Sequence, residues 1–192
     1  MAIDLAFRER AVQKLTNEVG VYVLCDLDQV PIYVGKSTDG IRVRVRRHLT
    51  SARSDIIANR QIDVREIAWV WAFPVERAGI NGLEALLYHH YNDVNALMNG
   101  TVPGRPAELS KVPGPAQVVQ VMADTEISEK QDPALRLPRQ SEHYSAMVSH
   151  FLTVKNSPQI ARAMVAHFER LNRYHARLLG LASKDEDNGG EE

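Results

Sequence analysis

The stretch "GVYVLCDLDQVPIYVGKSTDGIRVRVRRH", residues 20–48, places two short strand-like segments directly before a basic run. Its first part, "GVYVLCD", is rich in β-branched and aromatic residues, and "IYVG" repeats that composition after a short turn. Two such segments so close together are expected to pair as an antiparallel hairpin. Six of the thirteen residues from Lys36 to His48 are basic. This run fits either a solvated helix face or a surface that holds phosphate.

The rest of the chain predicts an α/β (α+β) fold, in which a small antiparallel three-stranded sheet is flanked by helices and followed by a C-terminal helical extension. Apolar spacing indicates helices at residues 3–17, 41–58, 83–98, 141–154 and 157–179. The third strand is expected at residues 65–75, where large apolar residues alternate. Residues 116–123 are a candidate short helix.

Composition divides the chain into four parts. Residues 1–100 hold the predicted strand–helix domain, and residues 101–140 form a connector rich in proline and glycine. A helical extension at 141–183 follows, and the acidic, glycine-containing tail at 184–192 is expected to be disordered.

The single cysteine, Cys25, rules out an intrachain disulfide framework and is expected to be a buried small hydrophobe. A reducing, cytoplasmic (intracellular) location is the simplest interpretation. No apolar run approaches the roughly 18 residues that span a bilayer, so we expect no membrane partner. The net charge is −1, yet residues 36–60 carry seven Lys and Arg against two Asp. A basic segment on an otherwise acidic chain predicts a phosphate-facing surface.

Several polar residues stand out within the predicted strand–helix core. Arg44 and His48 are four residues apart, so they share one helix face, and Glu84 is expected in the first turn of a helix. Three residues of the set have ordinary alternatives: Tyr22 as a core or edge tyrosine, His48 as a surface helix residue and Asn95 as a helix C-cap. The full set is Tyr22, Tyr33, Lys36, Arg44, His48, Glu84 and an asparagine near residue 95.

The order of these residues resembles the GIY-YIG nuclease superfamily over roughly residues 18–100. Gly20-Val21-Tyr22 and Tyr33-Val34-Gly35 match the paired motif that names the superfamily, with valines in place of isoleucines. Arg44 and His48 match its helical arginine and histidine, and Glu84 in "GLEALLYHHYN" matches its glutamate. The closing asparagine is Asn95 by spacing, with Asn92 and Asn99 as near rivals. In style the chain is closest to GIY-YIG restriction endonucleases and to the N-terminal nuclease of excinuclease C.

The resemblance implies a metal-dependent endonuclease that hydrolyses phosphodiester bonds in DNA. A tyrosine can act as a base when nearby cations lower its pKa, and Lys36 and Arg44 are candidates for that role. Arg44 can also bind phosphate oxygens through two donors. Glu84 is the only carboxylate of the set and would bind one divalent ion, Mg²⁺ or Mn²⁺. The alternative is a catalytically inactive nucleic-acid-binding or assembly protein that keeps the fold.

The two C-terminal helices carry apolar residues at helical spacing, with four arginines between them: Arg162, Arg170, Arg173 and Arg177. We expect these helices to pack on the core or on a second subunit, which leaves a homo-oligomer open. The arginines are candidates for gripping substrate.

Overall fold

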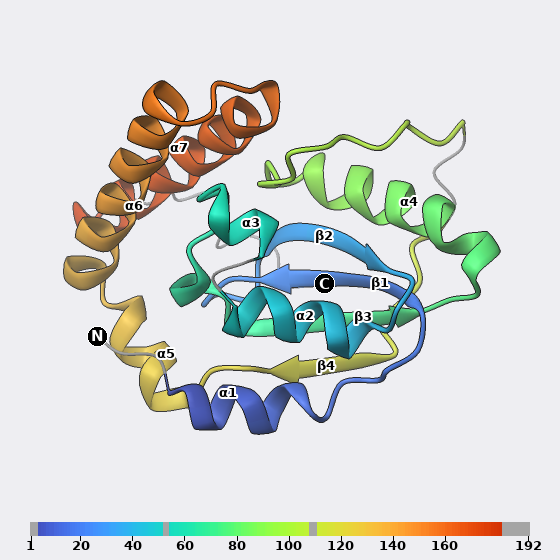
Figure 1. The fold of residues 1–192 in the computed structure, drawn as a ribbon. Helices are drawn as coiled ribbons and strands as arrows, with labels where there is room; N and C mark the ends of the chain where they lie inside the picture. Colours follow the sequence, from blue (N-terminus) through green and yellow to red (C-terminus); the bar gives the residue numbers. More distant parts are fainter. Residues whose placement is uncertain (1–3, 52–53, 108–110, 182–192) are drawn as a thin grey trace, which may run out of the picture.

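The computed structural model describes residues 4–51, 54–107 and 111–181. The expected start of the first helix at residue 3 and the expected disordered tail at 184–192 lie outside these residues. The elements follow one another in the order α1 (Leu5–Val12), β1 (Gly20–Cys25), β2 (Pro31–Ser37), α2 (Ile41–Thr50), α3 (Asp55–Ala58), η1 (Val64–Glu66), β3 (Trp69–Pro74), η2 (Arg77–Gly79), α4 (Ile80–Asn92), β4 (Gln117–Gln120), α5 (Asp124–Gln131), α6 (Pro133–Thr153) and α7 (Pro158–Leu178) (Figure 1).

The fold is α+β, with a small antiparallel sheet surrounded by helices, as predicted. The sheet has four strands in the order β2-β1-β3-β4, so the expectation of three is wrong. Strand β1 pairs with both β2 and β3, and every pairing is antiparallel. Because β2 stands at the edge of the sheet, its outer backbone groups need partners from elsewhere in the chain.

Alternating side chains of the central strand feed two cores on opposite faces of the sheet. Tyr22 and Leu24 belong to the core that α1 and α2 cover. Val21 and Val23 point the other way, into the core that α4 covers. The period of two along a strand produces this division, so side chains from both layers can meet only around an edge of the sheet.

Several helix boundaries differ from their predictions, and α1 ends at Val12 rather than at residue 17. The expected helix over 41–58 is interrupted, since α2 ends at Thr50 and α3 begins at Asp55. Helix α4 spans Ile80–Asn92 rather than 83–98. Glu84 therefore lies in the second turn, and its expected place in the first turn is wrong. The helix includes Gly82, a residue that favours a loop in the sequence.

The predicted connector contains regular structure. Residues 117–120 form the edge strand β4 and not a short helix, because the four-residue segment "QVVQ" pairs with β3. Helix α6 begins at Pro133, where proline suits the first turn of a helix. It continues past Pro138, which lies inside the helix. The connector thus supplies the last strand of the sheet and the start of the helical hairpin formed by α6 and α7.

A buried cluster of charged residues joins this helical hairpin to the β1–β2 turn and η1. Arg136 donates to Glu66 Oε2 at 2.9 Å and to Asp28 Oδ2 at 2.6 Å, and its guanidinium lies 4.0 Å from the Tyr174 ring centroid. Arg170 donates to the buried Asp26 carboxylate. Burial alone would raise the pKa of Asp28, but its arginine partners hold that pKa below its usual range. The helical hairpin is therefore attached to the core partly through paired charges.

All four C-terminal arginines contact protein groups. Arg162 donates to the Gly100 carbonyl, Arg173 to Asn95 at 2.6 Å and Arg177 to Asp28 at 2.9 Å, while Arg170 binds Asp26. The expectation that α6 and α7 pack on the core is confirmed, because Met147 and Ala163 join the core beneath α2. The arginines contribute to that attachment, and their expected role in gripping substrate stays a prediction.

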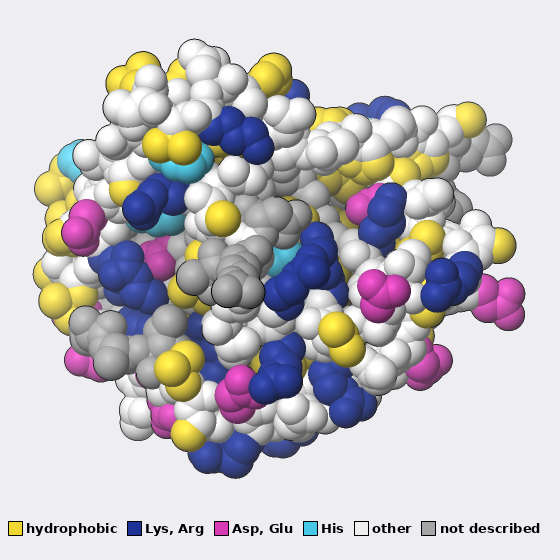
Figure 2. Space-filling view, in the orientation of Figure 1, with side chains coloured by type: hydrophobic (Ala, Val, Ile, Leu, Met, Phe, Trp, Pro, Cys, Tyr) yellow, Lys and Arg dark blue, Asp and Glu magenta, His cyan; other side chains and the backbone are white. Residues whose placement is uncertain are grey.

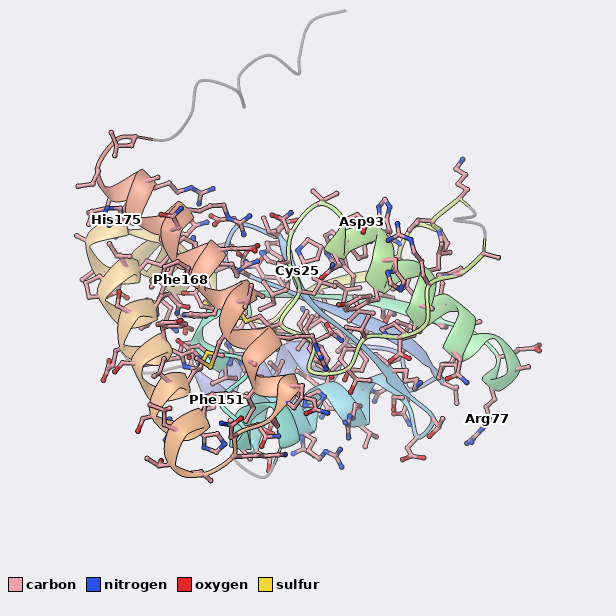
Figure 3. All side chains as sticks on the ribbon, turned by 90° about the horizontal axis from the view of Figure 1, so that it is seen from above. Cys25, Arg77, Asp93, Phe151, Phe168 and His175 are labelled. Atoms are coloured by element: carbon pink, nitrogen blue, oxygen red, sulfur yellow. The ribbon has the colours of Figure 1, made fainter. Side chains whose placement is uncertain are left out.

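Seen from above, α6 and α7, which carry Phe151, Phe168 and His175, lie on one side of Cys25, and the end of α4 near Asp93 lies on the other (Figure 3). Cys25 is fully buried in β1, as predicted, and burial raises its thiol pKa. Among the helices of the described residues, none combines the length and hydropathy needed to cross a bilayer.

Candidate active site at the edge of strand β2

A pocket of about 710 Å³ opens beside the edge strand β2. It is a meeting point of the two layers, since it takes residues from β1 and β2, from α2 on one face and from α4 on the other. Five of the seven predicted site residues line it: Tyr22, Tyr33, Lys36, Arg44 and Glu84. A sixth, His48, lies buried behind Tyr22.

Tyr22 reaches the pocket by crossing the neighbouring strand at a glycine. Tyr22 of β1 is in register with Gly35 of β2. A Cβ atom at position 35 would lie 2.4 Å from the Tyr22 hydroxyl and 2.8 Å from the Tyr33 ring. No side chain larger than hydrogen fits there, so Gly35 is what lets the two tyrosines sit 6.3 Å apart between ring centroids. The glycine in Tyr33-Val34-Gly35 is thus required by the close approach of the two tyrosine side chains.

Behind Tyr22, a hydrogen-bonded chain leads into the protein. The Tyr22 hydroxyl lies 2.7 Å from His48 Nε2, and His48 Nδ1 lies 2.6 Å from the Ser54 hydroxyl. All three residues are at most 1% exposed. A neutral imidazole has one donor and one acceptor nitrogen, so His48 can exchange a proton with Tyr22 while Ser54 fixes its ring. Ser54 has no counterpart in the sequence prediction, because a serine six residues after His48 gives no local signal.

Helix α2 presents Arg44 to the pocket from the side opposite α4. The helix begins after Gly40, whose φ of 106° suits glycine, and its first amides donate to the carbonyls of Glu18 and Thr16. This start fixes the helix against the loop that precedes β1. Lys and Arg side chains spread over the face that carries α2 (Figure 2). Arg44 is therefore the pocket-lining member of a broader basic surface.

On the opposite side, α4 provides a carboxylate that is paired with a lysine. Lys36 Nζ donates to Glu84 Oε2 at 2.7 Å and to Asn81 Oδ1 at 2.8 Å. The side chains of Lys36 and Glu84 are 42% and 18% exposed, so the pair is accessible to a ligand. Lys36 points toward α4 because successive residues of a strand face opposite sides of the sheet, and the preceding residue, Gly35, faces the side on which Tyr22 lies.

The asparagine at the site is Asn99 and not Asn95. Asn99 Oδ1 accepts from Val34 N at 3.0 Å, and its Nδ2 donates to the Val34 carbonyl. Asn99 therefore supplies the hydrogen-bond partners of the Val34 backbone at the outer edge of β2, next to Tyr33. Asn95, the residue predicted by spacing, instead accepts a hydrogen bond from Arg173. Asn92 accepts a hydrogen bond from the Leu97 backbone N–H.

The donor set suits a weakly held, largely hydrated divalent ion. Within residues 4–51, 54–107 and 111–181, no three His, Cys, Asp or Glu side chains gather as a metal-binding group. Mg²⁺ commonly uses one or two carboxylates and completes its shell with water and substrate phosphate. Glu84 is the residue that could hold such an ion, and the ion would compete with Lys36 for its carboxylate.

The far wall of the pocket comes from the C-terminal helical hairpin, which sequence reasoning did not connect with the site. Lys155, Ser157, Gln159 and Ile160 line it, and Arg162 fixes the adjoining Gly100 carbonyl. No local pattern reveals these residues, because only the docking of α6 and α7 brings them to β2.

Comparisons with protein-family models, with curated proteins and with solved structures find no match to this chain.

Proposed function

We propose that this protein is a metal-dependent endonuclease that hydrolyses phosphodiester bonds in DNA through a GIY-YIG-type site. The observation that carries the proposal is the buried Tyr22–His48 contact, 2.7 Å long, at the base of a pocket that also holds Arg44 and Glu84. A phenol backed by an imidazole is equipped for proton transfer. A plain core tyrosine would need neither the imidazole nor the pocket.

The proposed reaction begins when Tyr22 takes a proton from the water that attacks phosphorus. As the phenolic oxygen gains that proton, its own hydroxyl proton passes to His48 Nε2. The new phosphorus–oxygen bond forms while the bond to the leaving oxygen breaks, and the leaving oxygen takes up a proton from solvent. Ser54 keeps the His48 ring in place throughout, because the hydroxyl lies 2.6 Å from Nδ1. Tyr22 is thus the base, and His48 is its proton acceptor.

Charge on the phosphoryl oxygens grows as the water attacks. Arg44 can place two N–H donors on those oxygens, and a preorganised donor of this kind is worth about 3–4 kcal/mol of barrier. Glu84 would hold the divalent ion, and bound Mg²⁺ would supply Lewis-acid stabilisation of the same charge. Lys36, released from Glu84, would remain beside the substrate as a further cation.

Cleavage of supercoiled plasmid tests the proposal. We expect nicked or linear product with Mg²⁺, no product with a chelator, and restored cleavage with Mn²⁺. Glu84→Ala should remove the activity while leaving the thermal unfolding midpoint within a few degrees. A matched control is Glu76→Ala, which removes an exposed carboxylate outside the pocket. Glu84→Ala protein that cleaves as fast as the wild type would reject the proposal.

One observation favours a second candidate, a nucleic-acid-binding protein without catalysis. Glu84 is already neutralised by Lys36 at 2.7 Å, so the pocket is held together without a metal ion. Under this alternative, Mg²⁺ leaves DNA binding unchanged and produces no cleavage. Isothermal titration with Mg²⁺ in the presence of DNA separates the two candidates, because only the nuclease should bind the ion through Glu84.

A further inference from the structure

The pocket is lined by two chemically different groups of side chains. The first group is the tyrosines, the cations and the carboxylate described above. The second group is three side-chain amides from two separate parts of the fold: Asn59 and Gln61 follow α3, and Gln159 lies in the first turn of α7. Phosphate chemistry needs no set of neutral amides, so this second group requires a separate explanation.

Two of the amide side chains, Gln61 and Gln159, meet over one glycine. A Cβ atom on Gly100 would lie 2.5 Å from Gln61 Nε2 and 3.0 Å from Gln159 Cβ. Both glutamines therefore pack against the backbone of Gly100, whose carbonyl Arg162 holds. Gly100 directly follows Asn99, and consecutive Cα atoms are about 3.8 Å apart. These two amides thus adjoin the residue that positions β2.

These amides retain their hydrogen-bonding capacity. In the part of the chain that the structure describes, the side-chain amides of Asn59, Gln61 and Gln159 make no hydrogen bond. Gln61 is only 6% exposed. The amide atoms of Asn59 and Gln61 are nevertheless not fully enclosed, and Gln159 is exposed. All three amides are therefore accessible to a ligand in the pocket that offers both donors and acceptors.

We propose that Asn59, Gln61 and Gln159 form a base-reading subsite, which recognises the nucleobase beside the phosphate that is cut, with adenine preferred. The inference rests on the proposed function. Asn and Gln amides pair with the N6 donor and N7 acceptor of adenine through two hydrogen bonds. A set of amides in the same pocket as the phosphate-binding groups gives the pocket sequence discrimination, which its charged residues do not provide.

Selection from a randomised DNA library tests the subsite without requiring cleavage. Glu84→Ala protein is used as the binder, and the enriched sequences are compared with those from Glu84→Ala combined with Gln159→Met or Gln61→Met. Methionine keeps the length of glutamine but removes its donors and acceptors. Gln159 is exposed, so its substitution leaves the fold intact even if Gln61→Met does not. Lys155→Ala is the matched control, because Lys155 lines the same wall but would contact phosphate.

We expect the parent to enrich adenine at one or two positions, and each methionine variant to lower that preference about tenfold, at the lower end of the value of one bidentate base contact. Lys155→Ala should weaken binding to all sequences equally. Unchanged preferences in the folded Gln159→Met variant, or no preference in the parent, would overturn the subsite. Adenine selection without cleavage by the wild type would instead reject the nuclease and leave the base reader. Cleavage without base preference would reject the base-reading subsite and leave the nuclease.

Discussion

The pocket and the joint between the helical hairpin and the core use the same residue type for opposite purposes. Arg44 lies on an amphipathic helix and lines an open pocket. Arg170 also lies on an amphipathic helix, yet it is 2% exposed and bound to Asp26. The joint places carboxylates of the β1–β2 turn and of η1 against its arginines. In the pocket, Glu84 is the one carboxylate among the described lining residues, and it is paired with Lys36.

The difference shows that a row of arginines on a helix does not identify a nucleic-acid surface. Whether such a row meets phosphate or carboxylate depends on residues distant in sequence. Asp26 lies 144 positions from Arg170, and Asp28 lies 149 positions from Arg177. The four experiments that follow test this division between a reactive pocket and a structural joint.

The largest expected effect is on the chemistry of the pocket. Arg44→Ala should lower the rate of cleavage by about 10²–10³-fold, because it removes a donor to charge that grows in the transition state. DNA affinity should change little, since other cations remain on the α2 face. Single-turnover cleavage and equilibrium binding measure the two quantities. Arg47→Ala, on the exposed side of the same helix, is the control, and equal effects from both variants would contradict the assignment.

The joint should respond in stability. Arg170→Met leaves the buried Asp26 carboxylate short of a partner, which typically costs about 3–5 kcal/mol in the free energy of unfolding. Urea denaturation measures it. Arg177→Ala is the matched control on the same helix, because its side chain is 45% exposed and its loss should cost about 1 kcal/mol or less. If Arg170→Met proves no more damaging than this control, the charged cluster is not what fastens the helical hairpin.

A pair of histidines makes the attachment sensitive to acid. Burial lowers the pKa of His167 to about 4, and burial also lowers the pKa of His143, 5.2 Å away between ring centroids. The unfolded chain protonates near pH 6.5, so the stability contributed by neutral His167 is complete above that pH and is lost as the pH falls toward 4. At pH 5 the loss is about 2 kcal/mol.

His167→Gln should remove this dependence. The difference in free energy of unfolding between the wild type and this variant should shift by about 2 kcal/mol between pH 7 and pH 5. His175→Gln replaces an exposed histidine of the same helix and should produce no such shift. Parallel stability curves for wild type and His167→Gln would show that His167 does not titrate in this way.

The smallest effect concerns the one lysine by which the helical hairpin meets the pocket. Lys155→Ala should lower the salt slope of DNA binding by about one and leave the cleavage rate at saturating DNA unchanged. Fluorescence anisotropy at several salt concentrations measures the slope. Lys111→Ala, an exposed lysine outside this pocket, should leave it unchanged. A slower cleavage step in Lys155→Ala would show that the helical hairpin also takes part in the chemistry.

The sequence predicts the first hairpin and several of the residues that line the pocket best, because both depend on short-range patterns. The β1–β2 pairing follows from adjacent β-branched segments, and Tyr22, Arg44 and Glu84 could be ordered along the chain by their motif. The structure brings them together as expected, apart from the helical turn of Glu84. The prediction of Asn95 was wrong because spacing alone cannot show which residue of the loop after α4 reaches the edge of β2. Asn99 reaches it and accepts a hydrogen bond from the Val34 backbone N–H.

Features that arise from distant contacts could not be predicted. Strand β4 has four residues, too few for alternation to be recognised, and it is specified by its pairing with β3. The start of α6 was obscured by Pro133 and Pro138, although proline at the first position of a helix is favourable. Ser54 and the amides of Gln61 and Gln159 have no motif, because their positions relative to the pocket depend on how α3 and α7 pack.

The long sequence separation between the joint's carboxylates and arginines has a consequence for synthesis of the protein. Ribosomes add about 5–20 residues per second. Arg170, 144 residues after Asp26, is therefore synthesised roughly 7–30 s later than Asp26. During the later part of that interval the tyrosine-bearing β1–β2 hairpin has been made, while the wall containing Gln159 is still being made. A nascent chain therefore lacks the completed pocket until the residues of α7 that line it have been made and have packed against β2.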